Sequence, residues 1–390
     1  MIKRDLFERL RSVAARSPSV TLTGPRQSGK STLCKQCFPK HDYCNFEAPD
    51  VRAFAADDPR AFLGQFKRGA ILDEIQRTPH LPSYLQELID RDPSPGRWIL
   101  TGSQNLALSD SVSQSLAGRT AVMHLLPLAR SEARRFESFP TSLDNTLLTG
   151  GYPRIFNEGL AAADWISSYV ATYVERDVRS ISNIGDLGTF QRFLGLCAGR
   201  SAQLLNLSSI ATDCGISQPT AKAWLSVLEA SFLIVRLPAF HANISKRLVK
   251  MAKLHFLDSG LHCWLLGIRN AKQLARHPLR GAIFESWVVS EIIKHRINRG
   301  ESGGVWHWRD QHGVEADLLV ERDGEIAAIV EAKAGQTVAS DAFAGLRRIR
   351  PIIDPKREVR SVLVYAGSDA QNRSDVSVVP WDELDRQEWA

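Results

Sequence analysis

Cysteine is scarce in this chain, with 6 among 390 residues. So few cysteines exclude a disulfide-stapled secreted scaffold, and we expect reduced thiols and a cytoplasmic protein. Long apolar runs are also missing, because no stretch approaches the ~18 consecutive apolar residues that cross a bilayer. The composition is 44% hydrophobic and 24% charged, without repeats or low-complexity tracts. Membrane-spanning, collagenous and wholly disordered proteins are therefore excluded, and no membrane partner is expected.

Charge is only slightly unbalanced. The chain has 49 Lys and Arg against 43 Asp and Glu, a formal net charge of +6. This surplus is compatible with phosphate-rich partners but too small to establish them. At about 150 residues per domain, the length predicts two or three domains with a large core.

Short apolar runs alternate with helical stretches in the first part of the chain, which predicts an α/β domain with a parallel sheet. Ile2, Leu6 and Leu10 are spaced like one face of a helix that docks on this domain. The turn-forming cluster Gly150-Gly151-Tyr152-Pro153 then opens a mostly helical region. A long helix from Gly281 precedes closely spaced strands. We predict three domains, 1–145, 146–275 and 276–390, with strands at 20–23, 70–72, 98–101, 120–126, 305–309, 316–321, 325–332 and 362–366.

The strongest local signal is a phosphate-binding loop that follows an apolar strand and opens a helix. Backbone N–H groups and the positive helix end can surround phosphate oxygens, and Lys30 can reach the terminal phosphates. The Ser31 hydroxyl can ligate Mg²⁺. We therefore predict that ATP and Mg²⁺ bind at Gly24, Pro25, Arg26, Gln27, Ser28, Gly29, Lys30, Ser31 and Thr32.

Two acids follow the next predicted strand. Asp73 and Glu74 would lie at the catalytic edge of the sheet, with Asp73 holding Mg²⁺ and Glu74 orienting or deprotonating the attacking water. Without the upstream loop, a helix N-terminus would explain such a pair equally well. A further strand leads to Ser103, which can reach the γ-phosphate or the water, with Thr101 and Gln104 as competitors.

At this point the residues resemble a known family, the AAA-type P-loop ATPases whose loop reads G-P-R-Q-x-G-K-[ST], fused to a C-terminal restriction-endonuclease-like domain. In that family a Gly-Arg pair follows the sensor strand, and Gly118-Arg119 stands in the matching place. The resemblance implies that Arg119 is an arginine finger donated across the interface of a homo-oligomer. A solvated surface arginine is the alternative. Other family-like stretches are Asn45-Phe46-Glu47, Gly151-Tyr152-Pro153, Tyr173-Val174-Glu175-Arg176-Asp177 and Phe256-Leu257-Asp258-Ser259-Gly260-Leu261.

Cys34, Cys37, His41 and Cys44 have the ligand types of a zinc knuckle. The spacing does not favour zinc. Cys34 and Cys37 fall on the helix opened by the phosphate loop, where small residues pack against the sheet. We interpret them as core residues.

Residues 207–237 predict a helix-turn-helix, with Ser208 as first cap and Gly215 in the turn. The apolar face of the second helix is formed by Ala221, Trp224, Leu225 and Leu228, and a strand follows, which favours a winged helix. DNA would meet the start of the second helix. Winged helices also serve as packing or protein-contact modules. The residues predicted to touch DNA are Gln218, Thr220 and Lys222, together with the basic run Lys246, Arg247, Lys250 and Lys253. The alternative for the basic run is a solvated surface without a DNA contact.

The C-terminal region places Asp317 on one strand and Glu331-Ala332-Lys333 on the next, joined by a hairpin at Asp323-Gly324. Asp317 and Glu331 can hold a divalent ion, while Lys333 orients water or stabilises the transition state. With Glu285 on the preceding helix, the set resembles the restriction-endonuclease-like core. The alternative is a domain without nuclease activity that only binds DNA or pairs subunits.

The leading hypothesis is an ATP-hydrolysing AAA-type protein that binds and remodels DNA, branched and single-stranded forms included. One alternative is an ATP-regulated, metal-dependent DNA endonuclease. The other is a nucleotide-gated module that binds protein.

Overall fold

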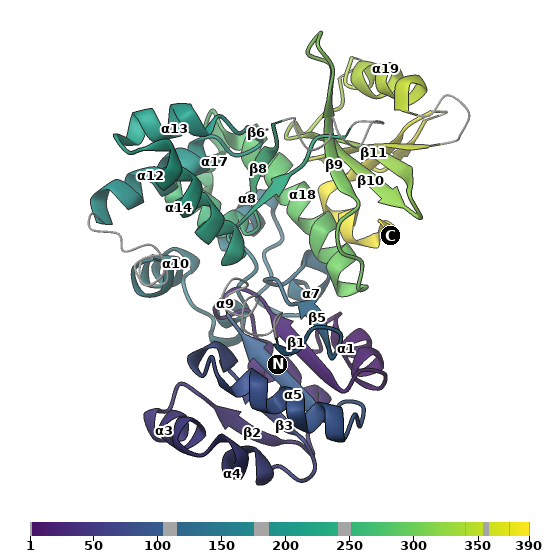
Figure 1. The fold of residues 1–390 in the computed structure, drawn as a ribbon. Helices are drawn as coiled ribbons and strands as arrows, with labels where there is room; N and C mark the ends of the chain where they lie inside the picture. The colour runs from purple at the N-terminus through teal and green to yellow at the C-terminus, as the bar shows by residue number, and fades with distance from the viewer. Residues whose placement is uncertain are drawn as a thin grey trace. The chain divides into compact units, whose positions relative to one another are not determined.

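The computed structural model describes residues 2–103, 115–174, 187–240, 251–339, 341–353, 359–373 and 375–389. By their contacts, these residues separate into two compact units (Figure 1). Unit 1 comprises 1–127, 230–232 and 297–300, and unit 2 comprises 128–229, 233–296 and 301–390. The predicted boundary after residue 145 falls inside unit 2.

Unit 1 is built on a parallel sheet with the strand order β2-β3-β4-β1-β5. The predicted parallel α/β domain is thus confirmed. An additional strand, β2, was not predicted, because it is a short edge strand with exposed residues and no apolar alternation. The strands are β1 (Ser19–Thr23), β2 (Asp42–Asn45), β3 (Ala70–Asp73), β4 (Trp98–Gly102) and β5 (Thr120–His124).

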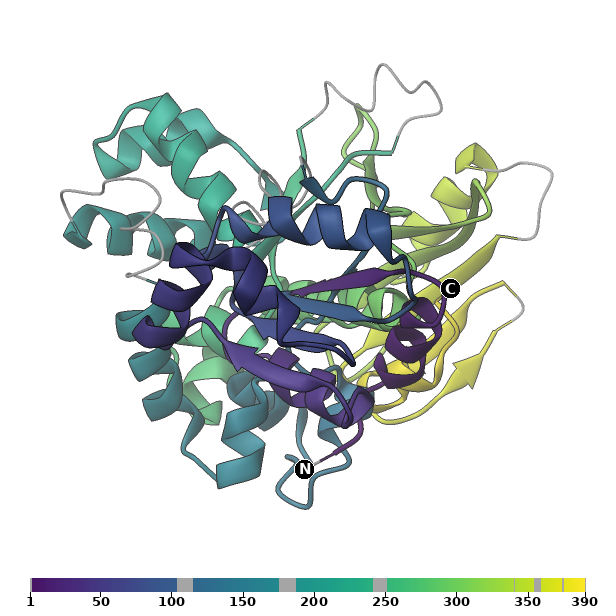
Figure 2. The same ribbon diagram turned by 60° about the horizontal axis from the view of Figure 1, so that its bottom comes forward.

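Helices cover both faces of this sheet, because successive strand residues point to opposite faces. Ile71 and Ile99 pack with Leu10 of the N-terminal helix, whereas Leu72 and Leu100 belong to the core on the other face. In Figure 2 the purple-to-blue helices lie on both sides of these strands. The helices are α1 (Phe7–Ala14), α2 (Lys30–Cys37), α3 (Pro49–Asp57), α4 (Pro59–Gly64), the 3₁₀ turn η1 (Ile75–Arg77) and α5 (Leu81–Arg91).

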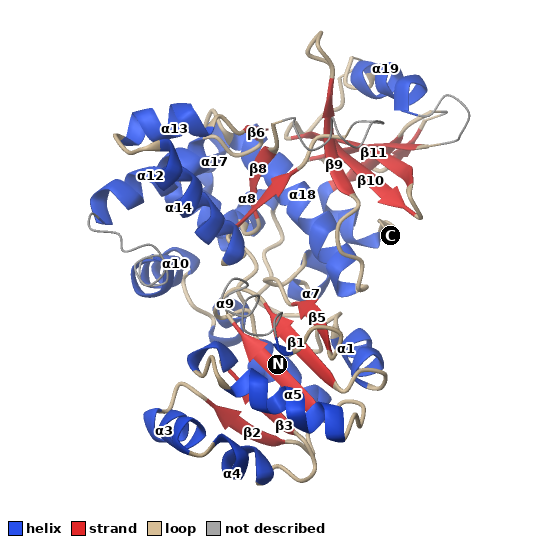
Figure 3. Cartoon of the chain, in the orientation of Figure 1, coloured by secondary structure: helices blue, strands red, loops and turns tan. Residues whose placement is uncertain are grey.

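Unit 2 begins as a mainly helical region with a small antiparallel sheet of order β6-β8-β7 (Figure 3). The sheet strands are β6 (Gln203–Leu204), β7 (Ile234–Leu237) and β8 (Lys253–Phe256). The helices are α7 (Arg130–Ala133), α8 (Leu143–Thr149), α9 (Pro153–Glu158), α10 (Ala162–Tyr169), the π-helical turn η2 (Val170–Val174), α12 (Leu187–Gly199), α13 (Leu207–Cys214), α14 (Gln218–Ala230), α16 (Ser259–Leu265) and α17 (Ala271–Arg276).

Helices α13 and α14 are joined by a tight turn, as predicted. Gly215 ends α13 with φ of 71°, a left-handed conformation that suits glycine. The cap of α13 is Asn206, whose side chain accepts a hydrogen bond from the Ser209 amide, and not the predicted Ser208. The predicted apolar face of α14 is buried, at Ala221, Trp224, Leu225 and Leu228.

The C-terminal part of unit 2 is a long helix followed by a mixed sheet of order β13-β14-β12-β11-β10-β9. Asp323 and Gly324 both have positive φ, as a two-residue hairpin turn between β10 and β11 requires. The elements are α18 (Arg280–Asn298), β9 (Val305–Arg309), β10 (Glu315–Arg322), β11 (Glu325–Lys333), α19 (Ala344–Ile353), β12 (Arg360–Tyr365), β13 (Gln371–Asn372), β14 (Ser377–Pro380) and η3 (Trp381–Arg386).

Two of the family-like stretches meet inside unit 2. The buried Asp258 carboxylate accepts hydrogen bonds from the Gly151 amide at 2.7 Å and the Leu261 amide at 2.8 Å. A Cβ on Gly150 would lie 2.5 Å from the same carboxylate, so only glycine fits there. These motif residues therefore have a packing role that joins α16 to the start of α9.

No described helix combines the length and the apolar character needed to cross a membrane.

Candidate functional site

The loop after β1 has a backbone that needs its glycines. A Cβ on Gly24 would collide with the carbonyl oxygen of Leu125, and Gly29 has φ of 92°. Gly29 is the N-cap of α2 and offers no side chain, so the first amides of the helix keep their hydrogen atoms for another acceptor. The loop therefore presents the amide-lined helix end that binds phosphate groups.

Lys30, the first residue of α2, is bent back over the loop. Its ammonium group donates to the carbonyl oxygens of Gly24 and Pro25, both at 2.9 Å. Burial lowers the pKa of Lys30, and the nearby carboxylates of Glu74 and Asp73 oppose that shift. A phosphate group arriving at the loop would supply the anion that this buried ammonium lacks.

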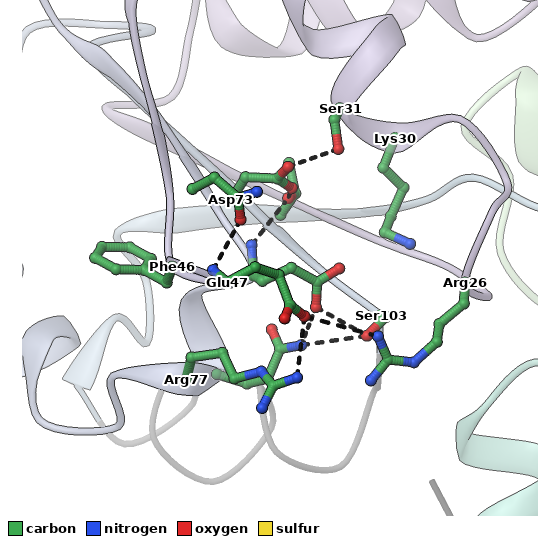
Figure 4. Close-up of polar contacts among 12 residues, drawn as sticks. Arg26, Lys30, Ser31, Phe46, Glu47, Asp73, Arg77 and Ser103 are labelled. Carbon is green, nitrogen blue, oxygen red and sulfur yellow. Dashed lines mark hydrogen bonds and ion pairs between the residues drawn. The ribbon is translucent and has the colours of Figure 1, made fainter. Parts of the chain in front are cut away.

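Asp73 ends β3 and collects three hydroxyl groups. Its Oδ2 accepts from Ser31 Oγ at 2.7 Å and from the Tyr43 hydroxyl at 2.6 Å, and its Oδ1 accepts from Thr101. Figure 4 shows Asp73 and Ser31 facing each other across the loop. Ser31 and Asp73, which were predicted as Mg²⁺ ligands from two separate segments, are thus in contact. Tyr43 was missed because it lies on the unpredicted strand β2.

Glu74 adopts a left-handed backbone with φ of 58°, which turns its side chain away from the strand direction. Its Oε2 accepts hydrogen bonds from Ser103 Oγ at 3.0 Å and from the side-chain amide of Gln76. The same amide also donates to Ser103 at 3.2 Å, which closes a triangle of polar groups. The predicted pair Glu74 and Ser103 is therefore in contact, and Gln76 joins it as a residue that sequence reasoning missed.

The family-like residue Glu47 lies at the rim of this site (Figure 4). Its carboxylate accepts from Arg77 at 3.0 Å and lies 3.9 Å from Arg26 of the phosphate loop. An arginine of the phosphate loop and an arginine of η1 therefore share this one carboxylate.

Arg4 reaches the phosphate loop from the start of the chain. Its guanidinium donates to the carbonyl oxygens of Ser28 at 2.7 Å and Leu126 at 2.9 Å, and the residue is 6% exposed. One side chain thus ties the loop to the segment after β5. The sequence predicted a docking helix here, but the bridging role depends on a contact with Leu126, which is 122 positions away in the sequence.

The donor set fits the predicted ligands. A hydroxyl and a carboxylate, Ser31 and Asp73, are hard oxygen ligands of the type that Mg²⁺ prefers. The amides of the loop and Lys30 provide the complementary charge for a triphosphate.

Arg119 and the phosphate loop lie at opposite ends of the strands of the unit 1 sheet. It precedes β5, whose first residue Thr120 pairs with Ser19 at the start of β1, whereas the loop follows Thr23 at the end of β1. The guanidinium pairs with Asp90 of α5, with one N–H to oxygen distance of 2.9 Å. The length of the strands therefore separates Arg119 from the phosphate loop of its own chain.

The residues predicted to touch DNA differ in exposure. Gln218 and Lys222 are exposed at the start of α14, and Thr220 is half-buried with its hydroxyl 2.8 Å from that of Ser217. For Lys253 the prediction is wrong, because its side chain is 2% exposed and ion-paired. The other basic residues, Lys246, Arg247 and Lys250, lie outside the described part of the chain, as does the competitor Gln104.

The predicted C-terminal residues do converge in unit 2. Asp317 Oδ2 accepts from the Ala332 amide at 2.8 Å, and Glu331 accepts from Lys333 at 2.6 Å. Lys253 Nζ lies 3.1 Å from Glu285. Burial raises the pKa of Glu331 to about 7 and raises the pKa of Asp317 and of Glu285, in each case against the pull of a nearby lysine.

The four candidate zinc ligands are spread over both faces of the unit 1 sheet. Cys34 and Cys37 pack in the core beside α1, and Cys44 packs in the core of the other face. His41 instead pairs with the Gly96 carbonyl at 2.8 Å. These residues are parts of the core and its border.

The parallel sheet, the strand–loop–helix and the adjoining acids define unit 1 as a P-loop ATPase-type domain. Residues 16–133 match the family model of the AAA domain. Residues 140–272 match a domain of unknown function (DUF8612), and residues 280–384 match a second one (DUF4143). The nuclease-like assignment of the C-terminal region thus finds no support in the family models.

Two relatives extend over nearly the whole chain. They are the uncharacterized proteins Rv2008c of Mycobacterium tuberculosis and Mb2031c of Mycobacterium bovis, each 31% identical over 388 residues. The alignments cover 98% of this chain and 84% of each relative. The chain belongs to the same family as these two proteins.

Solved structures show weaker similarity. The Walker-type ATPase PABY2304 of Pyrococcus abyssi is 15% identical with a TM-score of 0.46, over 67% of this chain and 95% of its own. RuvB of Thermotoga maritima is 17% identical with a TM-score of 0.33, over 61% of this chain and 90% of its own. Scores this low carry no argument about function.

Proposed function

We propose that this protein hydrolyses ATP and uses the reaction to change how it holds DNA. The observation that carries the first half is the meeting of Lys30, Ser31, Asp73, Glu74 and Ser103 at one edge of the parallel sheet. A lysine, a hydroxyl–carboxylate pair and a second acid are the parts that phosphoryl transfer to water requires.

Each residue has a distinct task in this proposal. Lys30 leaves the carbonyls of Gly24 and Pro25 and binds the terminal phosphates. Ser31 and Asp73 would hold Mg²⁺, which would neutralise charge on the phosphates. Glu74 accepts a proton from the attacking water or orients it, and Ser103 with Gln76 holds the Glu74 carboxylate in place.

The decisive experiment is the rate of phosphate release by the full-length protein and by Lys30→Ala. We expect the variant to lose at least ~10²-fold in rate, because a preorganised charge at the phosphates is removed. Lys40→Ala is the matched control, since Lys40 is an exposed lysine just after the same helix. An unchanged rate in Lys30→Ala would overturn the ATPase proposal.

Support for the DNA part comes from α14. Gln218 and Lys222 stand exposed at the N-terminal end of the second helix of a helix-turn-helix pair, and β7 and β8 follow as an antiparallel pair of strands. In the proposal this region acts as a winged helix, whose second helix places its N-terminal end in the major groove. The net charge of +6 agrees with a polyanionic partner.

The DNA part is tested by adding single-stranded, duplex and branched DNA to the ATPase assay and by measuring binding at several salt concentrations. Lys222→Ala should weaken binding and lower the salt slope by about one phosphate contact. Lys272→Ala, an exposed lysine of α17, is the control. If no DNA alters the rate and none binds at low salt, the nucleotide-gated protein-binding module becomes the better reading.

A homo-oligomer is part of the proposal because of Arg119. Arg119 lies at the end of the strands away from its own phosphate loop. In the proposal it therefore completes the ATP site of a neighbouring subunit. In that arrangement hydrolysis depends on the subunit interface, so binding of ATP and arrangement of subunits on DNA become coupled.

A further inference from the structure

The carboxylate cluster of unit 2 contains a lysine that the sequence pattern did not include. Lys253 is the first residue of β8, and it lies among acids from α18 and β10. Its Nζ is 3.1 Å from Glu285, 3.6 Å from Asp317 and 3.8 Å from Glu315. The lysine side chain is only 2% exposed, so these carboxylates are its immediate surroundings.

The two lysines of the cluster are paired with different acids. The Lys253 ammonium donates a hydrogen bond to the Glu285 carboxylate. The second lysine of the cluster, Lys333, does not compete for these acids at closest range, because it pairs with Glu331 at 2.6 Å. Each cation thus has its own carboxylate partners.

A divalent ion would need the same space. Carboxylate ligands approach Mg²⁺ or Ca²⁺ to about 2.0–2.6 Å, and an ion bridging Glu285 and Asp317 would have to lie between their oxygens. Lys253 Nζ already lies within 3.1 Å of Glu285 and 3.6 Å of Asp317, so such an ion would meet its charge at close range. Within the described ranges no group of three His, Cys, Asp or Glu side chains has the geometry of a metal site.

One acid of the cluster has a carboxylate oxygen that accepts no hydrogen bond from the described residues. Glu331 is 9% exposed, and its Oε2 is buried without a hydrogen-bond partner. A buried carboxylate oxygen without a hydrogen-bond donor is costly, so this atom favours an added cation.

We propose that the Lys253 ammonium is the resident cation of this cluster, bound at Glu285 and at Asp317, one of the two acids that the sequence predicts as ligands of a divalent ion. The cluster is then an ion-paired core that joins β8 to α18 and β10, and it does not serve metal-dependent DNA cleavage. Removing the lysine side chain converts the core into a divalent-cation site. The proposal does not depend on ATP hydrolysis by unit 1.

The test uses the full-length protein without nucleotide and Mn²⁺ as the probe, with bound Mn²⁺ measured by electron paramagnetic resonance. Wild type and Asp317→Asn should bind the same background amount of Mn²⁺. Lys253→Met should bind additional Mn²⁺, and the double variant Lys253→Met, Asp317→Asn should lose that gain. Lys253→Arg keeps the positive charge and should stay at the wild-type level.

Three outcomes would overturn the proposal. The first is Mn²⁺ binding by wild type that Asp317→Asn lacks, and the second is plasmid cleavage by wild type with Mn²⁺ that Asp317→Asn lacks. Both comparisons decide the question even if Lys253→Met does not fold. The third is a folded Lys253→Met, judged by circular dichroism, that gains no Mn²⁺.

Discussion

Two sites in this molecule combine a buried lysine with acids at the edge of a sheet, and they differ in what the lysine touches. Lys30 in unit 1 rests on two backbone carbonyls, while Asp73 is held by hydroxyl groups. Lys253 in unit 2 rests directly on carboxylates. Among the described residues, only Lys253 of the two has groups of opposite charge within ion-pairing distance, so the two lysines are held differently.

The functions proposed for the two sites follow this difference. In the proposal, Lys30 exchanges neutral carbonyls for a phosphate group, and Asp73 with Ser31 would hold the metal ion. Lys253 has its anions already, and its departure would leave several buried carboxylates without a counter-charge.

The largest effect is expected at Arg119, which belongs to neither lysine site of its own chain. Arg119→Ala should keep ATP affinity and lower hydrolysis by ~10³–10⁵-fold, as for other arginine fingers. Asp90→Ala removes the same ion pair and should keep its hydrolysis rate. If both variants lose hydrolysis equally, Arg119 has only a structural role. Nucleotide titration and phosphate release distinguish these cases.

At Glu74 we expect a loss of ~10²–10⁴-fold in hydrolysis for Glu74→Gln, because the amide cannot take the proton of water. ATP binding should remain, since Lys30 and the loop amides are unchanged. Glu87→Gln on α5, where the glutamate pairs with Arg60, serves as control. Full activity of Glu74→Gln would exclude the proposed base.

For Lys253 the expected effect is on stability. Lys253→Met should lower the free energy of unfolding by about 3–5 kcal/mol, because buried carboxylates lose their counter-charge. Lys333→Met removes a lysine that is half exposed, and it should cost less than Lys253→Met, because water can partly replace its charge beside Glu331. Denaturant unfolding of both variants checks the difference. Equal losses would show that the two lysines are held alike.

The smallest effect is expected at Arg4, which supports the phosphate loop without touching the nucleotide. Arg4→Ala should raise KM for ATP about tenfold, a change of ~1.4 kcal/mol, with little change in kcat. Arg4→Lys keeps the charge but cannot bridge both carbonyls, and it should fall between wild type and Arg4→Ala. A fall in kcat at constant KM would show that Arg4 acts on the chemistry.

Local patterns predicted the strands of unit 1 that carry apolar residues and the hairpin at Asp323-Gly324. They did not predict β2, whose residues are polar and lie at an edge of the sheet. Tyr43 and Gln76 were missed for a related reason, because nothing in their neighbourhood marks them. Their roles arise from hydrogen bonds to Asp73, Glu74 and Ser103, which are brought near by the parallel sheet.

Spacing along the chain alone determined the phosphate loop, because Gly24, Gly29, Lys30 and Ser31 act through a backbone that they shape themselves. Strand alternation and the hairpin also predicted that Asp317, Glu331 and Lys333 would gather in one place, and the family resemblance added Glu285. Only the tertiary structure decided which cation stands between the acids, since Lys253 comes from a separate strand. An ion pair depends on distance in space, and that distance is set by how the elements of unit 2 pack.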